Sequence, residues 1–399
     1  MKTAYIVDVL RTPIGKYGGA LASLRPDDLA AIVIRELMTR NSALDPQVIE
    51  EVIFGAANQS GEDNRNVARM ALLLADLPES IGGVTVNRLC ASGLSSITLA
   101  AQSIHTDHGA AFIAGGVESM SRAPYVISKS TEGFTRNQEM VDTTIGWRFT
   151  NPELSRRHYP YSMGETAENV ALKWNISRVE QDRFGLESQE KYFRAEAAGL
   201  FKDERITLHA NQGKKPVVID TDEYPRKTTL EQLAALKPAF KTNGTVTAGN
   251  ASGINDGAAA TLLVNEDMLK QFDLKPMARV VASATAGVNP AFMGIGPVPA
   301  VRKALQRAGL QLKDIDLVEL NEAFAAQALA CIHDLQLNPD LVNVNGGAIA
   351  MGHPLGCSGV RITATLLHEL ARRKGRYGLA TMCVGVGQGV AVIYENLRR

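Results

Sequence analysis

Short apolar runs alternate with amphipathic segments along the first part of the chain. Strand-like runs occur at 3–9, 52–54, 84–87 and 111–116, and helix-like segments begin at Pro26 and cover 66–75 and 92–104. Proline followed by two acidic residues at 26–28 is typical of a first helical turn. This order predicts a parallel sheet covered by helices on both faces.

The last part of the chain repeats that order. We expect strands at 279–282, 317–320, 342–345, 377–383 and 390–395, and helices at 298–308, 323–333 and 358–374. Each copy has a similar residue pair at the same distance ahead of a strand. These pairs are Ala43-Leu44 and Gly309-Leu310. The pattern predicts two copies of one α/β unit. The first covers residues 1–121 and is completed by about 246–274, and the second covers 275–399.

The segment between the copies, residues 122–245, is richer in charge and has helical patches at 165–174 and 178–198. We interpret it as an inserted subdomain that lies over the ends of the sheet strands.

Composition excludes several function classes. Lys and Arg total 42, as do Asp and Glu, so the formal charge is zero. A general nucleic-acid or membrane-surface binder needs a basic field, so we expect neither partner. The longest stretch without charge, between Arg279 and Arg302, contains several prolines and does not predict a membrane span. The N-terminus lacks the apolar core of a signal peptide.

Cysteine usage favours a reducing compartment. The four cysteines form no CxxC pair and no metal-ligand cluster with the seven histidines. We therefore expect a cytoplasmic protein with free thiols and no bound metal.

Open α/β sheets bind ligands at the carboxyl ends of their strands, and candidate side chains follow four of the predicted strands. Cys90 directly precedes the helix that begins near Ser92, where unpaired N–H groups favour a thiolate. His353 lies between Gly352 and Pro354, where it acts as a base or is only structural. Cys383 precedes a glycine-rich turn that either binds an oxyanion or simply joins two strands.

The remaining candidates are more ambiguous. Asn321 follows a predicted strand and either donates to an oxyanion or caps the next helix. Cys331 and Cys357 are interpreted as core residues. The glycines at 385, 387 and 389 are not a dinucleotide fingerprint, because a strand follows them. The sequence predicts no NAD, FAD or metal site.

Five segments together resemble the thiolase family over the whole chain. They are 87–93 (NRLCASG), 115–121 (GGVESMS), 321–325 (NEAFA), 346–359 and 383–389. The resemblance implies two βαβαβαββ halves in a five-layered αβαβα fold, with an inserted α/β loop domain at 122–245 that covers coenzyme A. It also implies a homodimer or homotetramer.

The resemblance also implies roles. Cys90 would accept the acyl group, and His353 would activate first Cys90 and then the CoA thiol. Cys383 would exchange a proton with the acetyl-CoA carbanion. Asn321 and His353 would hold the water of one oxyanion hole, and the N–H groups of Cys90 and Gly385 would form the other. Coenzyme A is then a substrate, and no permanently bound cofactor is needed.

For CoA, the family pattern points to six residues of this chain. Arg226 would lie near the adenine-phosphate end, and Met163 would lie near the thioester. The pantetheine arm would contact Ala248, Ser252, Ala323 and Phe324. Ser162 departs from the biosynthetic branch, which usually has His there, and Val384 and Val386 stand in a turn that is often Ile and Gly.

Three further segments, 61–66, 87–90 and 142–149, resemble the branch that cleaves 3-oxoadipyl-CoA to succinyl-CoA and acetyl-CoA. A diacid needs a cation at the far end of the pocket, for which Arg65 and Arg148 are candidates. Alternatives are a straight-chain 3-ketoacyl-CoA or acetoacetyl-CoA thiolase, a hydroxymethylglutaryl-type condensing enzyme and a non-catalytic acyl-CoA binding protein. Cys383 favours the thiolases over the condensing enzymes.

Overall fold

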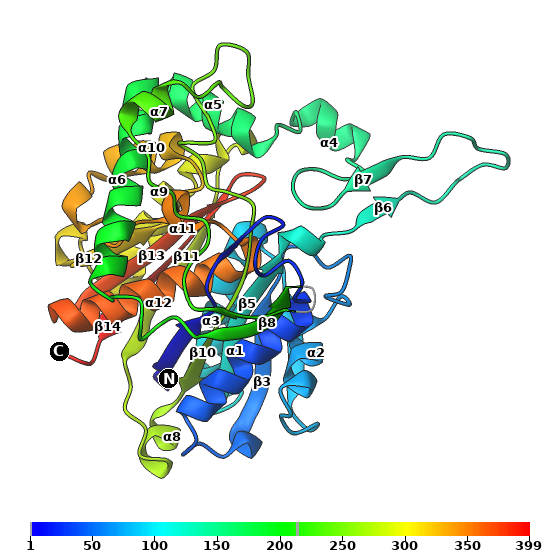
Figure 1. Cartoon of the computed structure of the whole chain (residues 1–399). Coiled ribbons are helices and arrows are strands. Elements are labelled where there is room, and N and C mark those ends of the chain that lie inside the picture. The colour runs from blue at the N-terminus through cyan, green and yellow to red at the C-terminus, as the bar shows by residue number, and fades with distance from the viewer. Residues whose placement is uncertain (1, 213–214) are drawn as a thin grey trace.

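One large mixed sheet forms the centre of the molecule (Figure 1). The computed structural model describes residues 2–212 and 215–399. In that part of the chain the sheet has ten strands in the order β12-β13-β14-β11-β1-β10-β5-β3-β4, with β2 beside β10. The strands are β1 (Tyr5–Arg11), β2 (Gly15–Lys16), β3 (Ile49–Gly55), β4 (Gly82–Val86), β5 (Ala111–Ser119), β10 (Asn255–Val264), β11 (Ala278–Gly287), β12 (Leu317–Leu320), β13 (Tyr377–Val384) and β14 (Gln388–Asn396).

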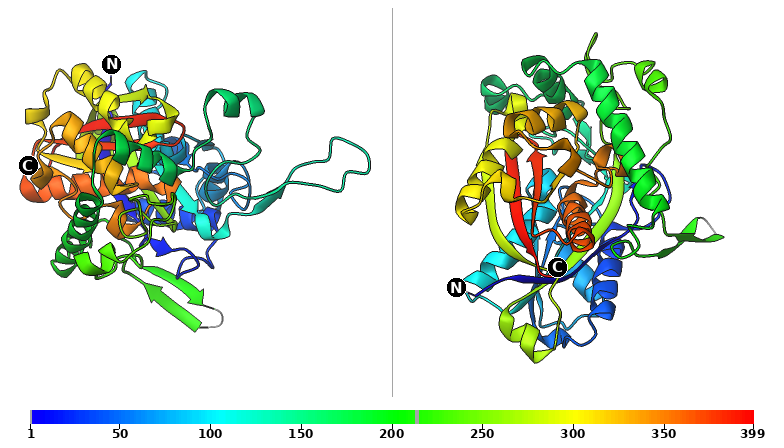
Figure 2. Two further views of the ribbon diagram at one scale, coloured as in Figure 1. Left: turned by 90° about the horizontal axis from the view of Figure 1, so that it is seen from above. Right: turned by 90° about the vertical axis from the view of Figure 1, so that its left-hand side faces the viewer.

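The two halves of this sheet meet only where Tyr5 and Ile6 of β1 pair with Arg279 and Ala278 of β11. Helices α3 and α12 lie between the halves, and Figure 2 shows α12 passing through the middle of the molecule. Helices α1 and α2 cover the outer face of the N-terminal half, and α9 and α10 cover that of the C-terminal half. These five layers confirm the expected architecture. The helices are α1 (Pro26–Arg40), α2 (Val67–Leu74), α3 (Ser92–His105), α9 (Pro297–Ala308), α10 (Ala325–Leu335), α11 (Ala348–Met351) and α12 (Leu355–Arg373).

The strands separate the core into layers because successive side chains point to opposite faces. In β14, Ala391 and Ile393 pack against the outer helices, whereas Val392 and Tyr394 pack against α3 and α12. The near-continuous apolar character of these strands follows from burial on both faces.

The sheet that the alternating pattern predicts as parallel is mixed. β3 is parallel to β4 and β5, and β12 is parallel to β13, but β1, β10, β11 and β14 pair antiparallel. A strand–helix–strand crossover gives parallel pairs, which is why the alternating pattern predicts a parallel sheet. β14 instead follows β13 through a tight turn, and β10 follows the inserted segment.

The strand expected at 342–345 is also wrong, because only Val342 makes a single bridge, to Val318. The side chain of Asn343 takes the place of a strand partner. Its Oδ1 accepts from the N–H of Leu320 and its Nδ2 donates to the carbonyl of the same residue, both at 2.8 Å. Asn343 has a φ of 46°, which ends an extended run.

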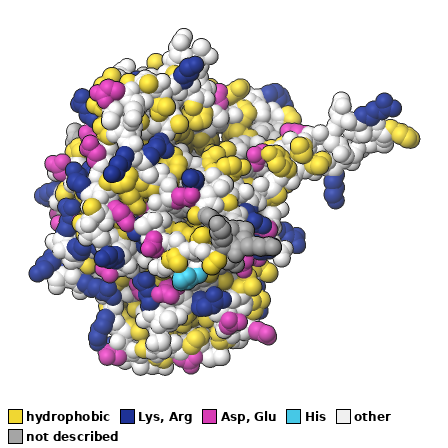
Figure 3. Space-filling view, in the orientation of Figure 1, with side chains coloured by type: hydrophobic (Ala, Val, Ile, Leu, Met, Phe, Trp, Pro, Cys, Tyr) yellow, Lys and Arg dark blue, Asp and Glu magenta, His cyan; other side chains and the backbone are white. Residues whose placement is uncertain are grey.

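In its described residues, the segment between the halves contains two small hairpins and four helices. A hairpin formed by β6 (Tyr125–Ile127) and β7 (Met140–Asp142) projects far from the body (Figures 1 and 3). None of the described helices combines the length and apolar character needed to cross a bilayer. The other elements are α4 (Pro152–Arg157), α5 (Met163–Lys173), α6 (Arg178–Ala197), β8 (Leu208–Gln212), β9 (Lys215–Ile219) and α7 (Leu230–Ala234), and α8 (Glu266–Gln271) follows β10.

Candidate active site

Cys90 lies in a one-turn 3-10 helix, Leu89–Ala91, between the end of β4 and the start of α3. Asn87 fixes this loop, because its Nδ2 donates to the carbonyl of Ala57 at 3.0 Å and its Oδ1 accepts from the N–H of Leu89 at 2.8 Å. Leu89 has a φ of 46°. The loop therefore holds a thiol at the carboxyl end of a strand, as the sequence predicted.

The helix start does not by itself lower the pKa of the Cys90 thiol. Burial raises the pKa of the Cys90 thiol to about 11, although the N–H groups of Gly385 and of Cys90 itself act in the opposite direction. The nearby carboxyl group of Glu118 raises the pKa further. The cost of desolvating a charged sulfur exceeds the effect of the helix terminus. Nucleophilic attack by this thiol thus requires a base.

His353 lies in the turn between α11 and α12 and is buried. Gly352, with a φ of 103°, permits the turn, and the N–H of His353 donates to Oδ1 of Asn255 at 3.0 Å. Nδ1 of the ring lies 2.6 Å from Oγ of Ser358. Burial and the Arg361 charge lower the pKa of His353 to about 3. The ring is neutral at physiological pH and able to accept a proton.

Asn321 follows β12 and directs its Nδ2 toward Nε2 of His353 at 3.3 Å. It is not a helix cap, because α10 begins at Ala325 and Phe324 occupies the cap position. The helix starts later than expected because Phe324 is extended and bridges to Ala251. The structure thus brings together Asn321 and His353, which are 32 positions apart in the chain.

Cys383 lies near the end of β13 and is almost completely buried. Burial raises the pKa of its thiol well above the ordinary value, and the proximity of Cys90 raises it further. Gly385, two residues later, directs its N–H to the sulfur of Cys90. The turn between β13 and β14 therefore joins two strands and also supplies a donor. Cys331 and Cys357 are fully buried core residues, as predicted.

A cavity of about 260 Å³ opens onto Cys90. It is lined by segments from both halves of the molecule and from the inserted segment. His353, Asn321 and Cys383 do not line it, since they lie deeper in the protein. Its lining includes Arg148, which was a candidate for binding a diacid, whereas Arg65 is exposed and does not contribute. The lining residues used below are Cys90, Glu118, Arg148, Met163 and Gly385.

Sequence reasoning assigned no role to Glu118, which lies at the cavity wall. This buried carboxylate accepts from the N–H groups of Ala57 and Asn58 at 2.9 Å and from that of Gly356 at 2.8 Å. Burial raises its pKa to about 7 against the effect of these donors. Glu118 fastens the loop after β3 to the first turn of α12. A single acid in the otherwise apolar run 111–118 was the signal that could have identified it.

The residues expected to contact CoA fall into two groups. In one, a guanidinium N–H of Arg226 donates to the carbonyl of Ala248, and the guanidinium lies 5.1 Å from the ring centroid of Tyr224. In the other, the N–H of Ser252 donates to the carbonyl of Ala323 at 3.0 Å. Three residues of this second group pack in one apolar cluster with Cys383, namely Ala323, Phe324 and Met163.

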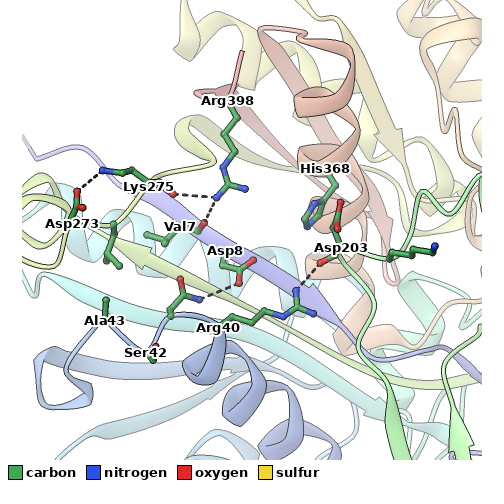
Figure 4. Close-up of a pocket in the computed structure, with 13 residues that line it drawn as sticks. Val7, Asp8, Arg40, Ser42, Ala43, Asp203, Asp273, Lys275, His368 and Arg398 are labelled. Atoms are coloured by element: carbon green, nitrogen blue, oxygen red, sulfur yellow. Dashed lines mark hydrogen bonds and ion pairs between the residues drawn. The ribbon is translucent and has the colours of Figure 1, made fainter.

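A larger cavity of about 590 Å³ lies elsewhere, beside the end of α1 and the start of the following loop (Figure 4). Two of its arginines already have partners, as the close-up shows. Arg40 donates to the carbonyl of Asp203 at 2.8 Å, and Arg398 donates to the carbonyls of Val7 and Lys275, both at 3.3 Å. None of the candidate catalytic residues lines this cavity.

Comparisons with known proteins agree with this geometry. Residues 4–267 match the model for the thiolase N-terminal domain, and residues 274–396 match that for the C-terminal domain. Proteins named beta-ketoadipyl-CoA thiolase from Escherichia coli and Pseudomonas putida are 56% and 53% identical, and each alignment covers 100% of both chains.

A solved structure shows the same fold. Human mitochondrial 3-ketoacyl-CoA thiolase in complex with CoA is 42% identical, with a TM-score of 0.92, and the match covers 99% of this chain and 98% of that one. With both halves matched by family models and the fold shared from end to end, the chain belongs to the thiolase family of acyltransferases.

Proposed function

We propose that this chain cleaves 3-oxoadipyl-CoA with CoA, giving succinyl-CoA and acetyl-CoA. Family membership supports the reaction type, and the names of the bacterial relatives support the substrate. The observation that carries the substrate assignment is that Arg148 lines the same cavity as Cys90.

In the first half-reaction, His353 takes the proton of Cys90, and the sulfur attacks the C3 carbonyl of the substrate. The C2–C3 bond breaks and leaves a succinyl thioester on Cys90. The departing acetyl-CoA enolate takes a proton from Cys383. The thiol of Cys383, whose pKa is raised by burial, is matched to proton exchange with carbon. The proton on His353 then returns to Cys383.

In the second half-reaction, His353 takes the proton of the CoA thiol. The CoA sulfur attacks the succinyl thioester, and Cys90 leaves as a thiolate and regains a proton from His353. Two oxyanions develop at different carbonyl groups. We assign one to a water held by Asn321 and His353, and the other to the N–H groups of Cys90 and Gly385.

Arg148 is suited to bind the terminal carboxylate of the acyl chain. It is half-buried and donates to Oγ of Ser60 at 2.8 Å. Within the part of the chain that the structure describes, the contact of its guanidinium group is this neutral hydroxyl and not a carboxylate. An unpaired carboxylate would be costly in a largely apolar cavity, and Arg provides a charge-assisted contact. At another part of the cavity wall, the carboxyl group of Glu118 would repel the terminal carboxylate of the acyl chain.

The test compares kcat/KM for 3-oxoadipyl-CoA with that for 3-oxohexanoyl-CoA, which differs only in the terminal carboxylate. One charge-assisted contact predicts a preference for the diacid of roughly ten- to hundredfold. A ratio near one would contradict the substrate and would leave the thiolase reaction intact. Preference for the neutral chain would favour a straight-chain 3-ketoacyl-CoA thiolase.

We further propose that residues 122–245 cover CoA between the two halves, with Arg226 at its adenine-phosphate end and Ala248, Ser252, Met163, Ala323 and Phe324 along its arm. Met163, Ala323 and Phe324 share one apolar cluster with Cys383. This supports a path for the CoA arm along these residues toward the reacting sulfur of Cys90. No permanently bound cofactor enters this scheme.

Assembly and compartment are also part of the proposal. The projecting hairpin exposes Tyr125, Ile127, Phe134 and Met140, with Phe134 fully exposed, and such a surface favours a homodimer or homotetramer. The four cysteines are free, which is in keeping with the cytoplasm. Size-exclusion chromatography with light scattering tests the assembly, and a monomer would contradict it.

A further inference from the structure

Arg361 is a fully buried charge in the central layer of the fold. It lies on α12 between Val360 and Ile362, two residues with no exposed surface. Its Nε and NH1 make no hydrogen bond within the described part of the chain. Its NH1 lies 3.7 Å from Oε2 of Glu319, and its NH2 donates to Oδ1 of Asn321 at 3.4 Å. Arg361 therefore touches the amide that faces His353.

The contact with Arg361 sets the direction of a chain of hydrogen bonds. A guanidinium group only donates, so the oxygen of the Asn321 amide faces Arg361. The amide nitrogen then faces Nε2 of His353 at 3.3 Å, and it also only donates. Nε2 is consequently the acceptor, and the ring proton belongs on Nδ1. An amide turned by 180° would present an oxygen to Nε2 and favour the opposite tautomer.

The far side of the ring agrees with this direction. Nδ1 of His353 lies 2.6 Å from Oγ of Ser358, and that hydroxyl donates to the carbonyl of Pro354 at 2.8 Å. Because the Ser358 proton is directed to the carbonyl, its oxygen is free to accept from Nδ1–H. Both sides of His353 thus favour one tautomer, with a lone pair on Nε2.

We propose that Arg361 is a positioning residue that orients the Asn321 amide and, through it, holds His353 in the tautomer whose Nε2 is a base. This inference rests on the role proposed for His353 above. Arg361 touches neither the acyl cavity nor the thiols, and it acts only through Asn321. Its charge also opposes protonation of the ring, in addition to burial.

The first measurement uses the unmodified protein and needs no substrate. Histidine labelled with ¹⁵N gives distinct nitrogen shifts for the two tautomers, and His353→Asn identifies which of the seven histidine signals belongs to His353. We expect a protonated Nδ1 and an unprotonated Nε2. A proton on Nε2 in the resting protein would overturn the proposal, and this result does not depend on which substrate the enzyme prefers.

The second measurement removes the charge. Arg361→Met alone would leave Glu319 buried without its cation, so it is combined with Glu319→Gln, and Glu319→Gln alone is the matched control. We expect kcat of the double variant to fall roughly ten- to hundredfold relative to that control, with KM little changed. In the double variant we also expect a mixture of the two His353 tautomers. With lysine in place of methionine, Arg361→Lys should restore most of kcat. A folded double variant with the kcat and tautomer of its control would overturn the proposal.

Discussion

Two side chains of the candidate site, half-buried Cys90 and buried His353, have pKa values shifted in opposite directions. Burial raises the pKa of Cys90 to about 11, and burial together with the Arg361 charge lowers that of His353 to about 3. Both groups are therefore neutral at rest. A buried ion pair of Cys90 and His353 would be costly, which is in keeping with two neutral groups.

The two thiols should separate the two stages of the reaction. Cys90→Ala should abolish both acylation and turnover, since the acyl group has no sulfur to bind. Cys383→Ala should still accept an acetyl group at Cys90 from acetyl-CoA but lose carbon–carbon cleavage. Intact mass spectrometry detects the adduct, and a thiolysis assay detects cleavage. Normal thiolysis by Cys383→Ala would remove Cys383 from the mechanism.

The acyl pocket offers a matched pair of arginines. Arg148 lines the cavity and Arg65 does not, so Arg148→Gln should reduce the preference for 3-oxoadipyl-CoA over 3-oxohexanoyl-CoA roughly ten- to hundredfold. Arg65→Gln should leave that ratio unchanged, because Arg65 is exposed. The ratio of kcat/KM values is measured for both variants. If both variants lost the preference for 3-oxoadipyl-CoA equally, the overall positive charge of the protein would set that preference, and not a contact with Arg148.

At the scale of elements, α3 and α12, which begin beside Cys90 and His353, pack unusually closely. A Cβ on Gly359 would lie 2.1 Å from the backbone nitrogen of Leu94, and one on Gly93 would lie 2.5 Å from the carbonyl of Gly356. The loop of Cys90 precedes α3, and the turn of His353 precedes α12. The distance between the two helices therefore sets the distance between the reacting groups.

A single methyl group at this contact should separate the helices. Gly359→Ala should destabilise the protein by about 1–3 kcal/mol through overpacking. It should also reduce kcat by up to about a hundredfold, because catalytic groups tolerate little displacement. Gly287→Ala is the control, since its Cβ would meet only one atom, at 3.9 Å. Denaturant unfolding and steady-state kinetics measure the two effects. Wild-type values for Gly359→Ala would contradict the packing argument.

At the scale of the whole molecule, a buried ion cluster ties the N-terminal strand to the inserted segment and to α12. Arg11, which is fully buried, contacts Oε1 of Glu204 at 2.7 Å and Oδ1 of Asp222 at 2.6 Å. Arg205 reaches the other oxygen of Asp222 at 3.2 Å, and Thr365 of α12 donates to Glu204 at 3.1 Å. The cluster thus unites segments that are distant in sequence.

This cluster should make stability depend on pH at the acidic end. Burial alone would raise the pKa of Asp222, but Arg11 and Arg205 lower it below its ordinary 3.8. Its contribution is therefore present above pH 3.8 and is lost as the pH falls through the lower folded-state value. Asp222→Asn should reduce the free energy of unfolding by about 3–5 kcal/mol at neutral pH. The difference from wild type should shrink as the pH falls below 3.8.

Urea unfolding at several pH values measures both effects. Asp273→Asn provides the control, because that carboxylate forms only an exposed pair with Lys275 and should contribute little. A pH-independent difference for Asp222→Asn would show that packing, rather than charge, is lost.

The sequence by itself determined the order of helices and strands, the duplication and the family. These depend on local periodicity and on short motifs, such as the residues around Cys90, and the structure and comparisons confirmed them apart from the strand at 342–345. The roles of Cys90, His353, Cys383 and Asn321 stay predictions that the geometry supports.

Only the tertiary structure showed the antiparallel pairings, the loss of a strand at 342–345, the raised pKa of Cys90 and the position of Arg148 rather than Arg65 at the cavity. It also identified Glu118 and Arg361. Hydrophobic period and turn chemistry act between near neighbours in the chain, so they can be recognised from sequence. Desolvation and hydrogen bonding depend on which distant segments meet, and α12 brings Arg361 to Asn321 across 40 positions.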